Sequence, residues 1–460
     1  MKQQLKEAVE LVERGLDKNV RLCVTGLSRA GKTAFITSFV NQLLHHKDSS
    51  GLPFWLSHAE GRILAVKIEQ HPELHIPAFP YADALKAIEE EASWPQSTRN
   101  VSQIRLSIKY KIKNRWVKKL QQVSHLKVDI VDYPGEWLLD LPLLQMNYQQ
   151  WSRQFYNWLA QEPQKSLSKQ FHESLKGFDA SQQYDEAQLK KISQSFRGFL
   201  IDCKQQGSGI HCIQPGRFVL PGDLDGAPVL DFFPCLDNVK VDISNTNFAQ
   251  LEKRYDYYQE QIVKPFFKEY FSKVDRQVLL VDCLEVLNQG YDSYKELQST
   301  LTKLITSFNY GESNWFKRMF QPSISKLLVA ASKSDHLPPE QHPNLKKFLS
   351  NMLNHSENLV GYQGVEVENT VFSAIEVTQP VKTDYQGQTL ICVKGLELDS
   401  GKEVVNYPGK IPTQPMTKTQ WQQQAFNFVD FAIPELPVGE ALPHQRMDQV
   451  IQALIGDKFL

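Results

Sequence analysis

One eight-residue stretch near the start of the chain constrains the fold more than any other feature. Residues 20–25 form a short β-rich run, and the apolar residues from Phe35 to Leu44 recur at helical spacing. Between them, residues 26–33 read GLSRAGKT and match the pattern G-x-x-x-x-G-K-[ST]. In this strand–loop–helix setting the pattern is typical of a loop whose backbone N–H groups point at the phosphates of a nucleotide. The sequence therefore predicts an α/β P-loop domain.

The residue types of this loop suggest individual roles. We expect the Lys32 ammonium to reach the β- and γ-phosphates as a catalytic group, and the Thr33 hydroxyl to be a ligand of Mg²⁺. The other candidate nucleotide-binding residues of the loop and its helix are Ser28, Arg29, Ala30, Gly31 and Ala34. A chance Gly-Lys-Thr turn is the alternative that the loop alone leaves open.

Composition narrows the class of protein. A chain of 460 residues suggests two or three domains, and 51 Lys+Arg against 52 Asp+Glu give no electrostatic reason to expect nucleic-acid binding. The six cysteines are scattered without a C-x-x-C pair, which suits a reducing compartment. Charges interrupt residues 1–16, and no run approaches the roughly 18 apolar residues of a membrane span. We therefore expect a cytoplasmic protein without a transmembrane segment.

A leading helix is expected between Leu5 and Leu16. Its apolar residues have near-helical spacing, and Gly15 and Asn19 mark its end. We expect this stripe to pack on the core, and a partner or membrane-surface face is the open alternative.

Strands and helices alternate on both sides of a long helical stretch. Apolar runs predict strands at residues 104–110, 127–131, 278–282, 324–331 and 368–375. Helical spacing recurs at residues 297–305, 345–349 and 448–454, and residues 390–405 predict a β-hairpin. This alternation predicts a doubly wound, mostly parallel sheet. The connection over residues 45–95 is too long to be a plain loop, so it should carry structure or function of its own.

Residues 138–273 have a different pattern of apolar residues. Aromatic residues recur there at helical spacing, which predicts the core of a helical bundle rather than a cofactor site. A Pro- and Gly-rich island at residues 214–234 predicts an ordered loop, in which Arg217 and Asp223 form either a structural ion pair or a functional pair. The predicted domains are residues 1–137 for the first part of the P-loop domain, 138–273 for the helical insertion and 274–460 for the remainder.

The strand at 127–131 ends in a second motif. Residues 132–135 read DYPG, which matches D-x-x-G. The Asp132 carboxylate can hold Mg²⁺ through water, and the Gly135 N–H can meet a γ-phosphate. This motif is common turn chemistry alone, but its position one hairpin after the phosphate loop supports the nucleotide site.

Two later strand ends predict recognition of the base. After the strand at 324–331, the Lys333 stem can lie along a purine ring while the Asp335 carboxylate accepts two N–H bonds from guanine. Adenine offers no such donor pair, so Asp335 would select guanine. His336 is a further candidate binding residue, and the backbone amides of residues Ser373, Ala374 and Ile375 can meet the guanine carbonyl oxygen. All these loops follow the carboxyl ends of predicted strands, where such sheets bind ligands.

Taken together, these motifs resemble those of Ras-type P-loop GTPases. Ser332-Lys333-Ser334-Asp335 matches N-K-x-D with Ser in place of Asn, which removes a tie between the base loop and the phosphate loop. The resemblance implies a threonine that closes on Mg²⁺ and the γ-phosphate. In residues 94–99, WPQSTR, that residue is Thr98, with Trp94, Ser97 and Arg99 as further binding candidates. An ordinary loop hydroxyl is the alternative for Thr98.

The same resemblance bears on catalysis. Glu136 stands where a water-orienting Gln often follows D-x-x-G, and its negative charge near the γ-phosphate predicts slow turnover. Arg99, or Arg29 in the phosphate loop, could act as an arginine finger in cis, although solvent-facing charge explains each equally well.

The chain also resembles the bacterial YcjX family of stress-associated nucleotide-binding proteins, through its WPxSTR, DYPGEW, QPGRFxLPGD and SKSD stretches. The resemblance implies a GTPase with an elaborated helical region and a link to envelope stress. An unidentified protein partner is a separate expectation. We therefore expect a GTP-binding switch that hydrolyses GTP slowly with Mg²⁺. An ATPase and a non-hydrolysing GDP- or GTP-binding module are the alternatives.

Overall fold

The structure is a computed structural model, and it describes residues 18–26, 30–47, 51–97, 100–113, 122–206, 210, 213–236, 245–271, 273–307, 324–361, 365–385, 387–424 and 426–459. The predicted leading helix lies outside these residues. The chain forms two compact units. The first comprises Met1–Tyr133, Val274–Asn288 and Ser323–Leu460, and the second comprises Pro134–Lys273 and Gln289–Pro322. The second unit thus contains the insertion predicted at 138–273 and also residues 289–322, which the sequence analysis assigns to the P-loop domain.

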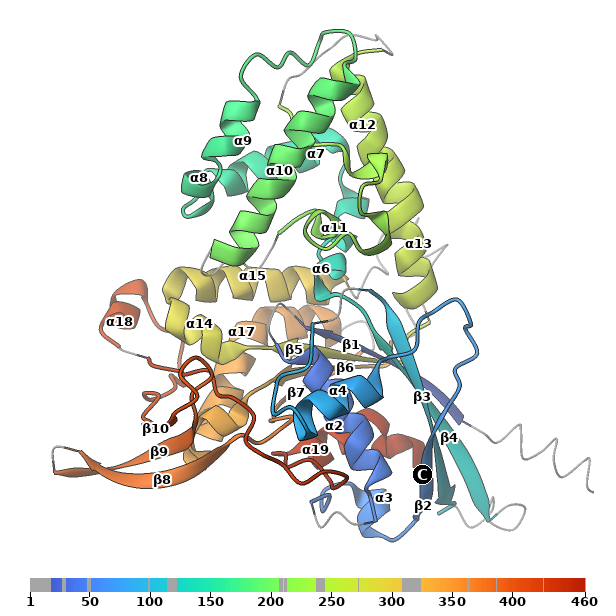
Figure 1. The fold of residues 1–460 in the computed structure, drawn as a ribbon, viewed down its shortest axis with the longest axis vertical. Coiled ribbons are helices and arrows are strands. Elements are labelled where there is room, and N and C mark those ends of the chain that lie inside the picture. Colours follow the sequence, from blue (N-terminus) through green and yellow to red (C-terminus); the bar gives the residue numbers. More distant parts are fainter. Residues whose placement is uncertain are drawn as a thin grey trace, which may run out of the picture. The chain divides into compact units, whose positions relative to one another are not determined.

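A seven-stranded sheet forms the centre of the first unit (Figure 1). Its strand order is β2-β3-β4-β1-β5-β6-β7. The strands are β1 (Lys18–Gly26), β2 (Ile63–Glu69), β3 (Ser102–Lys111), β4 (Val123–Asp132), β5 (Arg276–Val281), β6 (Lys326–Ala331) and β7 (Glu366–Val371). Strands β4, β1, β5, β6 and β7 are parallel neighbours, whereas β2 and β3 run antiparallel at one edge. The predicted mostly parallel α/β fold is confirmed.

The central strands are apolar on both faces because helices cover both. Every residue of β5 is buried, as expected for a strand inside a parallel sheet. The covering helices are α2 (Lys32–Leu44), α14 (Cys283–Gln289), α17 (His342–Gly361) and α19 (Met447–Ile455). In Figure 1, α2 and α19 lie on one face and α14 and α17 on the other. The Phe35 ring of α2 meets Phe372 edge-on at 5.5 Å, which fixes this helix against the end of β7.

The long connection after α2 carries structure, as its length predicts. It contains α3 (Leu56–Ala59), the edge strand β2 and α4 (Tyr81–Glu89). Residues 366–371 form β7, so this strand ends earlier than the predicted 368–375, and residues 373–375 are free to form a loop.

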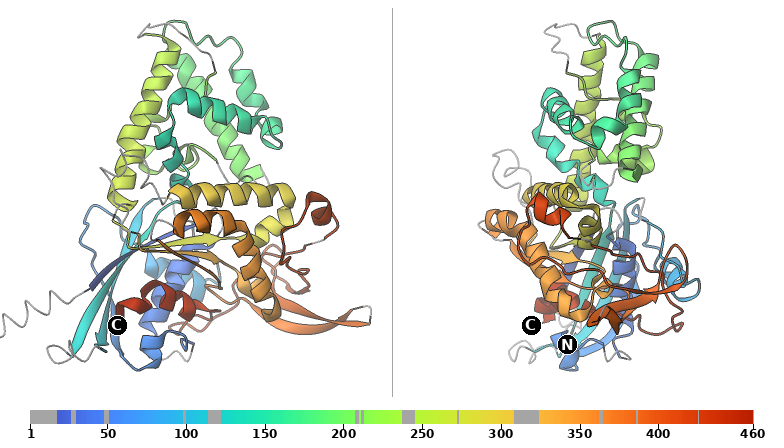
Figure 2. Two further views of the ribbon diagram at one scale, coloured as in Figure 1. Left: turned by 180° about the vertical axis from the view of Figure 1, so that it is seen from behind. Right: turned by 90° about the vertical axis from the view of Figure 1, so that its left-hand side faces the viewer.

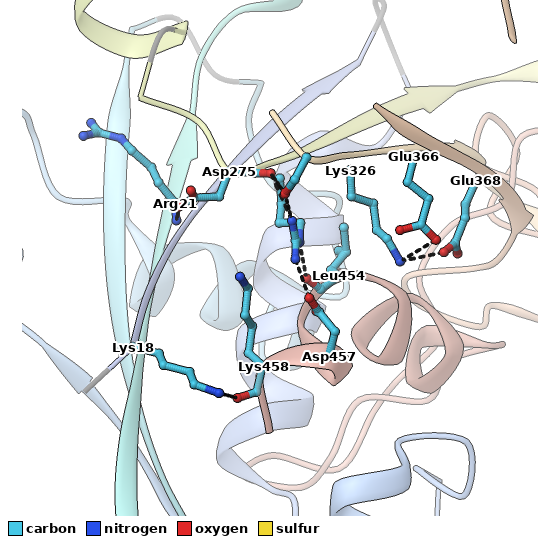
Figure 3. A network of polar contacts seen from close by, with 11 residues as sticks. Lys18, Arg21, Asp275, Lys326, Glu366, Glu368, Leu454, Asp457 and Lys458 are labelled. Carbon is cyan, nitrogen blue, oxygen red and sulfur yellow. Dashed lines mark hydrogen bonds and ion pairs between the residues drawn. The ribbon is translucent and has the colours of Figure 1, made fainter. Parts of the chain in front are cut away.

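A polar network at the amino ends of the strands holds the C-terminal turn η8 (Gly456–Phe459), as Figure 3 shows. The Arg276 guanidinium pairs with the Asp457 carboxylate at 2.6 Å and donates to the Leu454 carbonyl at 3.2 Å. The Lys18 ammonium donates to the Lys458 carbonyl at 2.9 Å. Beside it the fully buried Phe459 completes the core. The end of the chain is therefore fastened at the opposite side of the sheet from the predicted ligand loops.

A second sheet is appended to the first unit. Strands β8 (Thr378–Tyr385), β9 (Gln388–Leu396) and β10 (Glu403–Asn406) form an antiparallel sheet in the order β10-β9-β8. Strands β8 and β9 project as a long ribbon (Figure 2). The predicted hairpin at 390–405 corresponds to β9 and β10, and β8 was not predicted. The short helix α18 (Lys418–Gln422) follows, and α19 matches the predicted terminal helix.

The second unit is helical. Its longer helices are α7 (Tyr148–Leu159), α10 (Glu186–Gln206), α12 (Asn247–Tyr258) and α15 (Tyr291–Ser307). Shorter elements are α6 (Gly135–Leu138), η1 (Leu141–Gln145), α8 (Gln164–Leu167), α9 (Lys169–Ser174), α11 (Gly216–Val219), η2 (Gly222–Leu224), η3 (Pro228–Leu230), α13 (Lys264–Phe266) and the π-helical turns η4 (Gln259–Val263) and η5 (Phe267–Phe271).

Aromatic side chains form the core of this unit. Trp151 stacks on Tyr255 with ring centres 5.1 Å apart, and Phe155 meets Phe196 edge-on at 5.2 Å. The aromatic stripes are therefore packing surfaces, as the sequence predicts. No described helix is both long enough and apolar enough to span a bilayer.

Candidate functional site

The phosphate loop joins β1 to α2 as the sequence predicts. Strand β1 ends at Gly26 and helix α2 begins at Lys32. Gly31 has φ 78° and ψ 30°, a left-handed conformation that glycine adopts without steric cost. Ala30 and Ala34 are buried, whereas the predicted residues Ser28 and Arg29 lie outside the described residues. The described residues therefore put the predicted phosphate loop between the end of β1 and the start of α2.

Lys32 lies where the phosphate loop meets the end of β4. Its ammonium donates to the Tyr133 carbonyl at 2.9 Å and lies 3.4 Å from the nearer Asp132 carboxylate oxygen. Asp132 is only 1% exposed and is paired in register with Val24 of β1. The lysine predicted to bind phosphate and the aspartate predicted to bind Mg²⁺ are 100 positions apart in the sequence, and the fold brings their side chains together.

The stretch predicted to close over the nucleotide also reaches this loop. The Thr33 hydroxyl donates to the Gln96 carbonyl at 3.1 Å. Ser97 is exposed beside Gln96, and the Trp94 indole N–H donates to the Phe431 carbonyl at 2.8 Å. Thr98 and Arg99 lie outside the described residues.

The oxygen atoms present fit a magnesium ion. A threonine hydroxyl and an aspartate carboxylate are hard ligands of the kind that Mg²⁺ prefers. The described residues contain no group of three or more His, Cys, Asp or Glu that could hold a metal. Because Mg²⁺ usually keeps several waters and binds substrate phosphates, Thr33 and Asp132 are compatible with an ion that would arrive with a nucleotide.

The base loop, residues 332–336, follows β6. Its two predicted guanine-binding residues, Lys333 and Asp335, have different partners. Lys333 is left-handed, with φ 59°, and its ammonium lies 2.7 Å from Asp282. Asp335 is 2% exposed, and one of its carboxylate oxygens accepts the Val377 amide at 2.9 Å. The carboxylate predicted to read guanine is therefore occupied by a backbone donor in this structure.

The loop after β7 contains the three backbone amides predicted to meet the guanine carbonyl oxygen, and two of them are available to a ligand. The Ser373 amide donates to the Gln445 carbonyl at 2.9 Å, so it is already used. The amides of Ala374 and Ile375 donate to no other described residue. His336 is buried with its ring edge-on to Phe431 at 5.0 Å. Burial lowers the pKa of His336 below its ordinary value, so the ring is neutral at pH 7.

Glu136 has its own partner within the helical unit. Gly135 and Glu136 begin helix α6, and the Glu136 carboxylate lies 2.5 Å from the Lys204 ammonium of α10. A Cβ on Gly216 would lie 1.9 Å from the Glu136 carbonyl oxygen, so only glycine allows this approach. The Trp137 indole N–H donates to the Leu220 carbonyl at 2.8 Å. The segment after D-x-x-G is thus an integral part of the helical unit.

The predicted island at 214–234 contributes to the same packing. The Arg217 guanidinium lies 3.2 Å from the centre of the Trp137 ring and 2.9 Å from the Asp223 carboxylate. Arg217 is buried while Asp223 is exposed. These contacts support the structural ion pair among the two interpretations of Arg217 and Asp223.

Comparison with known proteins identifies the family. A model of the YcjX-like family, DUF463, matches residues 20–459. The chain belongs to the YcjX-like family. Two relatives described as "Ras-like GTPase YcjX" are each 38% identical to it. The relative from Shewanella oneidensis aligns over 99% of this chain and 97% of its own length, and the relative from Escherichia coli aligns over the whole of both chains.

Some contacts of this YcjX-like site escape prediction from sequence. The carbonyls of Gln96 and Tyr133 act through the main chain, which carries no side-chain signal. Phe431 and Lys204 lie outside every motif. Only Asp282 had a usable signal, since it is an acidic residue directly after a buried apolar strand.

Proposed function

We propose that this protein binds GTP and GDP with Mg²⁺, hydrolyses GTP slowly and acts as a nucleotide-dependent switch. The observation that carries the proposal is the placement of Lys32 against both the Tyr133 carbonyl and the Asp132 carboxylate. A lysine that follows a phosphate loop and has two oxygen partners can release the Tyr133 carbonyl and bind phosphate oxygens instead. The relatives described as Ras-like GTPases support guanine nucleotides as ligands.

Different residues of the first unit would bind the phosphates, the metal and the base. Lys32 would neutralise charge on the β- and γ-phosphates, as the loop amides bind their oxygens. Thr33, Asp132 through water, and Thr98 would hold Mg²⁺. The metal, when bound, neutralises charge that develops on the phosphates. Asp335 would accept the guanine N–H groups after its carboxylate releases the Val377 amide.

The helical unit bears on turnover and switching. Gly135 follows Asp132 by three residues, and we assign its amide to the γ-phosphate on the sequence pattern. Because the Glu136 charge is taken up by Lys204, Glu136 is poorly suited to orient water, which supports slow hydrolysis. Any acceleration would come from Arg99 or Arg29. A role in envelope stress rests on the family resemblance.

A cytoplasmic location is part of the proposal. The five cysteines within the described residues are free and buried, as expected for a reducing compartment.

The pairing of Glu136 with Lys204 also favours a second candidate function. If no residue orients the attacking water, the protein would bind GDP or GTP without turnover and use the nucleotide as a structural ligand. Phosphate release from GTP separates the two functions. A slow rate that falls in Arg99→Ala supports the GTPase, whereas no release from the wild-type protein supports the binding module.

Calorimetric titration tests the choice of nucleotide. Nucleotide-free protein is titrated with GDP and with ADP, each with Mg²⁺, and both titrations are repeated on Asp335→Ala and on the control Asp399→Ala, which changes an exposed aspartate of the appended sheet. We expect GDP binding that Asp335→Ala abolishes and Asp399→Ala preserves. Equal or tighter ADP binding would contradict guanine recognition and favour an ATPase. An Asp335→Ala variant that keeps its preference for GDP would exclude Asp335 as the residue that selects guanine.

A further inference from the structure

The base loop contains a buried carboxylate that no motif assigns. Asp282 follows directly after β5, next to the loop that follows β6. The two strand ends are joined in register, with Val281 beside Ala331, and the Ser332 amide donates to the Val281 carbonyl at 3.1 Å. Asp282 therefore enters the base loop from the neighbouring strand.

Both oxygens of Asp282 are engaged. One accepts the amides of Leu284 and Glu285 at 3.1 and 3.0 Å, which caps the start of α14. The other lies 2.7 Å from the Lys333 ammonium. Because the helix cap fixes the carboxylate, Asp282 presents a rigid charge to a lysine that would otherwise have many rotamers.

The two charges are opposite, and the carboxylate is buried while the ammonium is partly buried. The Asp282 side chain is 4% exposed and that of Lys333 is 28% exposed. Burial acts to raise the pKa of Asp282, but the Lys333 ammonium, the Glu285 amide and His336 together hold that pKa below the ordinary value. A buried carboxylate of this kind is stable only with its partner in place, so the position of each residue depends on the other.

The backbone of Lys333 also needs support. Its φ of 59° and ψ of 35° are left-handed, which costs a non-glycine residue roughly 1–2 kcal/mol. Such a conformation persists where the surroundings fix it. The ion pair to Asp282 and the turn that His336 closes by donating its amide to the Lys333 carbonyl at 3.1 Å provide that fixation.

The first residue of the S-K-S-D motif does not supply a comparable contact. Ser332 occupies the position of Asn in N-K-x-D, and its buried hydroxyl has no hydrogen-bond partner among the described residues. We propose that Asp282 is the positioning residue of the base loop, which holds the Lys333 stem at the place where it lies along the guanine ring. The proposal rests on guanine-nucleotide binding by this chain.

The structure supplies a matched control. Asp430 lies 3.5 Å from the same ammonium, but its side chain is 69% exposed. A solvent-exposed charge at this distance contributes little. Asp430→Asn therefore removes a charge of the same type from the same lysine without touching the buried pair.

A double-mutant cycle tests the proposal by GDP calorimetry with Mg²⁺. The variants are Asp282→Asn, which keeps an oxygen for the helix cap, Lys333→Met, which keeps an apolar stem but removes the ammonium, and their combination. We expect Asp282→Asn and Lys333→Met each to weaken GDP binding about 10-fold, and the double variant to be no weaker than the single ones. Asp430→Asn should change the affinity less than about 2-fold.

Each other outcome has a definite meaning. Losses that multiply in the double variant, or a thermal midpoint that falls while GDP affinity stays unchanged, would show that Asp282 only stabilises the fold and would overturn the proposal. A wild-type protein that binds no GDP would overturn the proposed function first, and this inference with it.

Discussion

The C-terminal turn gives the sharpest prediction for the stability of the first unit. Phe459→Ala removes a ring that is fully buried. The ring meets Tyr110 edge-on at 4.9 Å and lies 5.8 Å from Trp55. The Arg62 guanidinium donates to the Phe459 carbonyl, a main-chain contact that the substitution keeps. The change therefore removes side-chain packing alone.

The contacts of the ring set the size of the effect. Truncation of a buried phenylalanine to alanine costs about 3–5 kcal/mol, which includes the cavity that remains. An edge-to-face pair contributes about 1 kcal/mol beyond the buried area. Because Phe459 is fully enclosed and has such a pair, we expect a loss of about 4 kcal/mol.

Hydrogen exchange along a urea series is the suitable measurement, because peptides from β1, β3 and β4 report on the first unit separately from the helical unit. Phe54→Ala is the control, since Phe54 is 58% exposed and should cost less than about 0.5 kcal/mol. A loss below about 1 kcal/mol for Phe459→Ala, or losses of equal size in the two variants, would refute the assignment of the turn as a core anchor.

Three further predictions concern the site and the helical unit. Lys32→Ala should weaken GDP binding about 10- to 100-fold in calorimetry, since a hydrogen bond from a charged group is lost, and an unchanged affinity would exclude Lys32 from phosphate binding. Urea unfolding of the helical unit should give a coupling free energy of about 1 kcal/mol in a double-mutant cycle of Glu136→Gln and Lys204→Met. The exposed pair Glu173–Lys176 should give almost none, and equal coupling in the two pairs would show that the partial burial of Glu136 and Lys204 adds nothing to their interaction. Burial raises the pKa of Asp140 from 3.8 to about 6. Between pH 4 and 6 the carboxyl is therefore ionised in the unfolded chain but still protonated in the folded one. The free energy of unfolding of the helical unit should fall by up to roughly 3 kcal/mol as the pH rises over that range. Asp140→Asn cannot ionise and should lose less stability over the same pH range in denaturant titrations, and an identical loss would show that other groups cause it.

The parallel sheet and the positions of the candidate ligand loops in it could be predicted because local signals coincide there. Residues 278–281 of β5 and 327–331 of β6 are continuous apolar runs, and a polar residue follows each. Such runs are typical of strands buried on both faces. The convergence of Lys32 and Asp132 follows from this topology alone, since parallel strands end at the same edge of the sheet.

Other elements could not be predicted because their sequences lack such a signal. β2 lies at the sheet edge with a mixed burial pattern, and β8 contains Pro380 and several exposed polar residues. The apolar stripe of α15 shows that the helix packs, but it does not identify the partner surface. Similarly, the pairs that Asp335 forms with Val377 and Lys333 with Asp282 depend on long-range geometry.

The position of β1 in the middle of the sheet has a consequence for synthesis on the ribosome. β1 pairs with β4 on one side and with β5 on the other, and β5 begins about 250 residues after β1 ends. At translation rates of about 5–20 residues per second, the second side of β1 waits roughly 10 to 50 s for its partner. Pro134–Lys273, most of the helical unit, is made during this interval. A nascent chain therefore carries an open, apolar strand edge during this interval, and unpaired strand edges of this kind are prone to aggregation.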